Sequence, residues 1–100
     1  MLETGISVRC EVSPGTFMSE YCVRILSAGV VLWEGAVDKE MVLALQGEPR
    51  EGACVAGEIY AYLVSFDGEQ ALVELPVESS SFGRRIFVPL GHVRKVRMPA

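Results

Sequence analysis

Side chains that carry chemistry are few in this chain and lie far apart. There is one histidine, His92, and there are three cysteines, Cys10, Cys22 and Cys54. Structural zinc sites usually use closely spaced pairs of such ligands, and the chain has no such pair. A catalytic nucleophile needs a neighbouring base and an orienting group, and no serine lies in a nucleophile-elbow pattern. The sequence therefore predicts no metal site, no cofactor and no enzyme.

The three cysteines also indicate a compartment. Their number is odd and their spacing is wide, whereas a small secreted domain usually pairs its cysteines in disulfides. We therefore expect a reducing cytoplasm. Cys10 alternates in phase with Ile6 and Val8, which places it in the core. We expect Cys10 and Cys54 to react slowly with a thiol reagent and Cys22 to react faster.

Charged side chains are divided unevenly along the chain. All 13 acidic residues precede Ser79, and the last part of the chain carries only cations. These cations are Arg84, Arg85, Arg94, Lys95 and Arg97. We predict that they gather in one basic patch that docks an acidic protein, the acidic face of a second copy or a phosphate backbone. The alternative is that acids on neighbouring strands, such as Glu58, Glu69 and Glu74, neutralise them.

Aromatic side chains provide a second candidate surface. Tyr60 and Tyr62 alternate with Ile59, Ala61 and Leu63, so both faces of this predicted strand are apolar or aromatic. Such a strand is either covered on two sides or left open on one side for a partner. We assign Trp33, Tyr60 and Tyr62 to a partner-binding surface and expect a homodimer or a larger complex, because small domains rarely expose large apolar patches without a use. Burial of these aromatics in the core is the alternative reading.

Alternation of apolar and polar residues, interrupted by turn residues, predicts the strands that position these side chains. The clearest turn is Asp67-Gly68, a pair that favours a tight β-hairpin. We expect strands at residues 6–12, 21–25, 30–37, 59–66, 70–77 and 84–88. The chain is therefore predicted to be a single all-β domain over residues 1–100. We expect a small, partly open barrel of six or seven antiparallel strands with one short helix or 3₁₀ turn.

Residues 38–47 contain the only helix candidate. Asp38 can cap the first amides, Glu40 suits the positive end of a helix dipole, and Gly47 can end the helix. These signals favour a helix, and a strand across residues 41–45 is the alternative.

The second half of the chain has a distinctive order of elements. A strand is followed by a tight turn at residues 67–68, a second strand, a loop at residues 79–83 and a third strand. The segment 88–93 (Val-Pro-Leu-Gly-His-Val) follows, with a proline at the end of that third strand. Over residues 55–96 this order resembles the Src-homology-three-like small barrel, in which a strand runs into a proline, one 3₁₀ turn and a last short strand. The resemblance implies that fold for this half of the chain.

Peptide recognition of that family's kind is not implied. The peptide-binding members carry a tryptophan after the acidic loop, where this chain has Gln70, Ala71 and Leu72. His92 stands where their groove tyrosine would be, and only Pro89 matches a groove residue. A shared fold does not carry a function with it.

Composition narrows the function further. The chain is 50% hydrophobic and 22% charged, which excludes wholesale disorder. Its apolar runs are too short to span a bilayer, so we expect no membrane association. We predict a non-catalytic protein-interaction or accessory module that binds a protein or itself. A nucleic-acid-associated barrel using the C-terminal basic patch is the alternative, disfavoured by the net charge of −4. A small enzyme is the second alternative.

Overall fold

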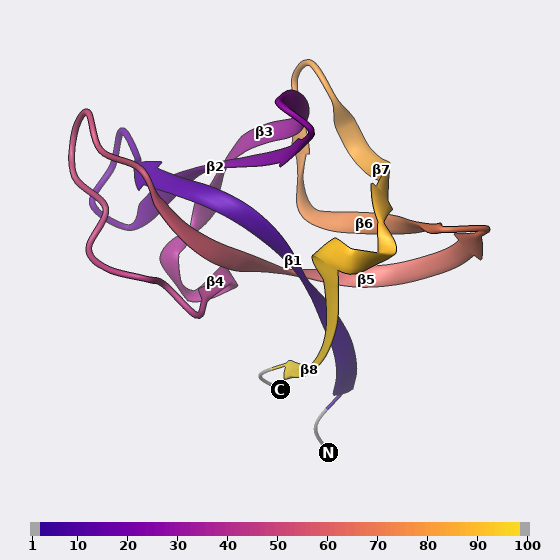
Figure 1. Ribbon diagram of the computed structural model, residues 1–100. Helices are drawn as coiled ribbons and strands as arrows, with labels where there is room; N and C mark the ends of the chain where they lie inside the picture. Colours follow the sequence, from indigo (N-terminus) through magenta and orange to yellow (C-terminus); the bar gives the residue numbers. More distant parts are fainter. Residues whose placement is uncertain (1–2, 99–100) are drawn as a thin grey trace.

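Antiparallel strands in the order β3-β2-β1-β5-β6-β7 build a small, nearly closed barrel, shown in Figure 1. The computed structural model describes residues 3–98. The six strands are β1 Glu3–Pro14, β2 Glu20–Ser27, β3 Val30–Asp38, β5 Val55–Asp67, β6 Gln70–Ser79 and β7 Gly83–Pro89. Two short strands pair at the side, β4 Val42–Leu43 with β5 and β8 Val93–Met98 with β1. The all-β prediction is confirmed, and each predicted strand lies within an observed one.

The two longest strands, β1 and β5, change partners along their length. One edge of β1 pairs with β8 near its start and with β2 near its end, while its other edge pairs with β5. The β1–β5 ladder stops at the pair Ile6–Ala61, and from Tyr62 onward β5 pairs with β6. In Figure 1 the start of β1 therefore diverges from the second half of β5.

A fully buried tryptophan helps to close the barrel between β3 and the β6–β7 loop. Trp33 is 0% exposed, and its indole nitrogen donates a hydrogen bond of 3.0 Å to the carbonyl oxygen of Gly83. A methyl group at Gly35 would lie 2.6 Å from the indole ring, so the absence of a side chain there makes room for it. The structure thus places Trp33 in the core and removes it from the predicted partner-binding surface.

The rest of the core consists of the inward-facing residues of the strands. Buried aliphatic side chains from all six strands form the core with the tryptophan, and Cys10 lies among them as predicted. The largest fully buried aliphatic side chains are Ile25, Ile59, Leu75, Val8, Val12, Val23, Val37, Val73 and Val88. Because successive residues of a strand point to opposite faces, the buried residues alternate with outward-facing ones in the sequence.

Residues 38–47 do not form the predicted helix. Asp38 ends β3 and makes no side-chain cap, only one 3₁₀ turn follows at Lys39–Met41, and the chain then extends into β4. Val42 pairs with Ile59 of β5. Pairing with the sheet therefore outweighs the capping signals, and the alternative of a strand is correct for β4.

The predicted end of the fold is present. A second 3₁₀ turn, Leu90–His92, follows the proline that ends β7 and leads into β8. Within residues 3–98, no helix has the length and apolar character needed to cross a membrane.

Candidate functional site

The five predicted cations do not gather in one patch. β7 pairs with β6 and β8 pairs with β1, and Figure 1 shows them in different parts of the fold. On β8, Arg94 lies opposite Ser7, whereas Lys95 lies opposite Ile6 and Arg97 follows two residues later. Because successive residues of a strand point to opposite faces, Lys95 and Arg97 lie on the face opposite to Arg94.

Two of these cations are paired with acids, as the neutralising alternative predicts. Arg85 Nε lies 3.1 Å from Glu74 Oε1, and Arg94 Nη2 lies 2.9 Å from Glu58 Oε1. Both pairs are partly exposed, and such pairs contribute only about 0–1 kcal/mol each to stability. Glu69 lies in the turn between β5 and β6, and no described residue forms an ion pair with it.

Arg84 has a different role, because it spans a break in the sheet. The β6–β7 ladder is irregular between Glu74 and Ser79. There Arg84 Nε donates to the carbonyl oxygen of Leu75 at 3.0 Å, and Nη2 donates to that of Pro76 at 3.3 Å. The guanidinium is thus hydrogen-bonded to two backbone carbonyl oxygens of β6, which gives Arg84 a structural role.

The register brings the remaining predicted residues to one outer face. Tyr60 lies opposite Ser7 of β1, and Tyr62 lies opposite Glu74 of β6. Residues that lie opposite each other in a ladder point to the same side of the sheet. The two tyrosines are therefore flanked by the Glu58–Arg94 pair on one side and the Glu74–Arg85 pair on the other. We call this surface the tyrosine face, consisting of Glu58, Tyr60, Tyr62, Glu74, Arg85 and Arg94.

Apolar side chains extend the tyrosine face toward the tip of the β5–β6 hairpin. Leu72 and Phe87 are opposite each other and lie on the same side as Glu74 and Arg85. Residues 62–67 of β5 are all exposed. Among the described residues only β6 pairs with this stretch of β5, so its second edge has no partner strand.

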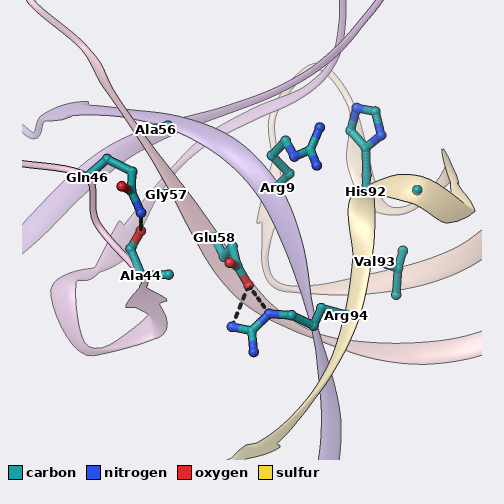
Figure 2. Close-up of a pocket in the computed structure, with 10 residues that line it drawn as sticks. Arg9, Ala44, Gln46, Ala56, Gly57, Glu58, His92, Val93 and Arg94 are labelled. Atoms are coloured by element: carbon teal, nitrogen blue, oxygen red, sulfur yellow. Dashed lines mark hydrogen bonds and ion pairs between the residues drawn. The ribbon is translucent and has the colours of Figure 1, made fainter.

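A depression of about 410 Å³ adjoins the tyrosine face between β1, β5, the Leu90–His92 turn and the loop after β4. Its charged and titratable lining residues are Arg9, Glu58, His92 and Arg94, and Figure 2 shows how they are arranged. Glu58 Oε1 accepts hydrogen bonds from the buried hydroxyl of Ser7 and from Arg94 Nε and Nη2. No described acid lies in ion-pair contact with Arg9.

His92 is fixed at the rim of this depression. Its Nε2 lies 3.0 Å from the carbonyl oxygen of Leu26. Since a carbonyl oxygen can only accept, Nε2 is the donor in this contact. Arg9 was not predicted as a site residue, because an arginine between buried strand residues has the pattern of an ordinary solvent-facing side chain. Only the folded structure shows that Arg9 and His92 line the same depression.

The cysteines do not add a site. Cys10 is buried and Cys22 is half-buried, whereas Cys54 is exposed, so the prediction of a protected Cys54 is wrong. Cys54 lies in the polar connector just before β5, where no sheet covers it. In the part of the chain that the structure describes, no group of three or more His, Cys, Asp or Glu side chains is placed to hold a metal ion.

No protein-family model matches the chain, and no curated protein or solved structure is significantly similar to it.

Proposed function

We propose that this chain is a non-catalytic protein-interaction module whose partner docks on the tyrosine face. The observation that carries the proposal is the register, which sets Tyr60 and Tyr62 side by side on an outer face between two arginine–carboxylate pairs. The partner is a protein, either another polypeptide or a second copy of this chain.

The composition of the tyrosine face supports this function. Protein interfaces are enriched in tyrosine and arginine, and their energetically important residues are often aromatic residues surrounded by a polar rim. Tyr62 and Phe87 are both exposed large side chains, and the ion pairs of Arg85 and Arg94 lie around them.

A protein fits this surface better than a nucleic acid does. Nucleic-acid binding depends on cations that neutralise successive phosphates. Here Arg85 and Arg94 already hold carboxylates, and Lys95 and Arg97 lie on the other face of β8 from Arg94. The geometry therefore favours the first predicted function over its nucleic-acid alternative.

We also propose that residues 55–96 form a Src-homology-three-like half of the barrel. The strand order, the tight turn at Gly68 and the 3₁₀ turn between β7 and β8 support it. A solved relative of this chain with that family's strand connections would support the assignment.

The proposed function is tested by capturing partners from a lysate of the source cells. The immobilised chain is compared with a double variant, Tyr62→Ser with Phe87→Ser, and bound proteins are measured by quantitative mass spectrometry. We expect a specific set of proteins, or the chain itself, to be retained by the wild type and lost from the double variant, since hot-spot aromatics carry much of the binding energy.

A matched control is Val30→Ser. Val30 is an exposed apolar residue at the start of β3, on the hairpin with β2 and away from the tyrosine face. This variant should retain the same proteins as the wild type. An identical set of captured proteins from the wild type and the double variant would contradict the proposal.

A further inference from the structure

We propose that the depression beside the tyrosine face binds a carboxylate group, with the guanidinium of Arg9 as its principal contact. The proposal concerns a small-ligand site. It goes beyond the proposed protein-binding function and does not depend on it.

The charge balance inside the depression leaves Arg9 available. Glu58 is the acid that lines the depression, and its Oε1 already accepts three hydrogen-bond donors from Ser7 and Arg94. Figure 2 shows the guanidinium of Arg9 on the His92 side, away from the Glu58–Arg94 pair. Among the lining residues, two guanidinium groups and one carboxylate leave one net positive charge, and Arg9 is the guanidinium without an ion-pair partner among the described residues.

The chemistry of arginine identifies the ligand class. A guanidinium group presents parallel N–H donors whose spacing matches the two oxygens of a carboxylate. Two neighbours of Arg9 already have partners of their own, since Arg94 pairs with Glu58 and His92 contacts the Leu26 carbonyl oxygen. The guanidinium of Arg9 is therefore the forked donor of the depression that can bind the two oxygens of a planar anion.

The size and the overall charge of the molecule favour a small anion. A volume of about 410 Å³ falls within the range of about 300–1,000 Å³ that is typical of small-ligand pockets. The chain has a net charge of −4, which repels a polyanion at long range. A small carboxylate instead responds mainly to the local excess charge near Arg9.

The test uses citrate as the probe, because each molecule carries several carboxylates. Citrate is titrated into the ¹⁵N-labelled chain at constant ionic strength, and the Nε–Hε signal of Arg9 and the amide signals of Gly57, Gly91 and Arg94 are followed by NMR. We expect saturable shifts confined to these residues. Arg9→Gln should weaken binding roughly tenfold or more, and Arg9→Lys, which keeps the charge but not the fork, should fall between them.

A matched control is Arg24→Gln. Arg24 is an exposed arginine on β2 that lies 3.6 Å from Glu34 and does not line the depression. This variant should bind citrate like the wild type. Equal affinities in the wild type and Arg9→Gln, or shifts that never saturate, would overturn the proposal. Inorganic phosphate is titrated in parallel, and saturable binding of phosphate without citrate would overturn the assignment to a carboxylate.

Discussion

At the scale of single residues, Arg84 and Arg85 show that neighbours of the same type can serve different purposes. Arg85 points to the tyrosine face and pairs with Glu74 in partly exposed surroundings. Arg84 points to the other side of β7 and donates to two backbone carbonyls where the β6–β7 ladder is interrupted. A carbonyl oxygen that loses its donor in a partly buried position costs more than a lost surface ion pair.

This difference predicts unequal effects on stability. Arg84→Ala should lower the free energy of unfolding by about 1–2 kcal/mol, because two charge-assisted hydrogen bonds to carbonyl oxygens are lost. Arg85→Ala should lower it by less than about 1 kcal/mol. Urea denaturation followed by circular dichroism measures both, and Arg85→Ala serves as the matched control. Equal losses in the two variants would contradict the structural role of Arg84.

The cysteines offer a second residue-scale prediction. Burial, together with the smaller effects of the Glu58 and Glu11 carboxylates, raises the pKa of the Cys10 thiol to about 12. Because the thiolate is the reactive form, we expect Cys54 to react fastest with a disulfide reagent, Cys22 more slowly, and Cys10 only after unfolding. Stopped-flow measurement on the wild type and on Cys54→Ser assigns the fastest phase. A native-state Cys10 that reacts as fast as Cys54 would contradict the burial.

At the scale of elements, the sequence was most informative where local pattern and tertiary contacts agree. Asp67-Gly68 and the flanking alternation predict the β5–β6 hairpin, because Gly68 has the positive φ of 62° that a tight turn needs. Residues 38–47 were predicted wrongly, because their capping residues favour a helix while β5 offers a strand partner at Val42. Local signals cannot reveal a partner that lies 17 residues away in the sequence, at Ile59.

The candidate site was only partly predictable for a related reason. Tyr60, Tyr62, Arg85 and Arg94 were named from composition and alternation, and the register does bring them to one face. Membership of that face depends on which strands pair and with what offset. A one-residue shift would move every side chain to the other side of the sheet. The sequence does not state these offsets, so the exclusion of Lys95 from this face and the placement of Arg9 in the adjoining depression required the structure.

The β3 strand carries an element-scale prediction. The Trp33 ring occupies the space over Gly35, where a methyl group would lie 2.6 Å from ring atoms. Gly35→Ala should therefore displace the ring, weaken its bond to Gly83 and destabilise the fold by about 1–3 kcal/mol. Gly91→Ala is the matched control, since a methyl group there meets no atom within 4 Å. Urea titration with near-ultraviolet circular dichroism tests both, and equal stability of the two variants would contradict the packing.

At the scale of the whole molecule, the second half of β5 has a sheet edge with no partner strand among the described residues. Contacts between β3 and the β6–β7 region, including the Trp33 bond to Gly83, close one side. On the other side β1 leaves β5 after Ala61, so residues 62–67 present backbone groups and apolar side chains to solvent. An irregularity between Leu63 and Ser65 bends this edge, which limits open-ended strand addition. A closed assembly of two chains is the form of association that such an edge favours.

We therefore predict that the chain self-associates at micromolar concentration through the second half of β5. Phe66, which is 63% exposed, lies at this edge, and a charge there should oppose strand pairing. Phe66→Lys should behave as a monomer of about 10.9 kDa in light scattering, while the wild type shows a larger mass. Val30→Lys introduces the same charge at a residue of similar exposure, 59%, on a different hairpin, so it should associate like the wild type.

If the wild type is already a monomer, or if both lysine variants dissociate equally, the open edge of β5 is not the contact between copies. Tyr62 and Phe87 would then be candidates for contact with a different polypeptide.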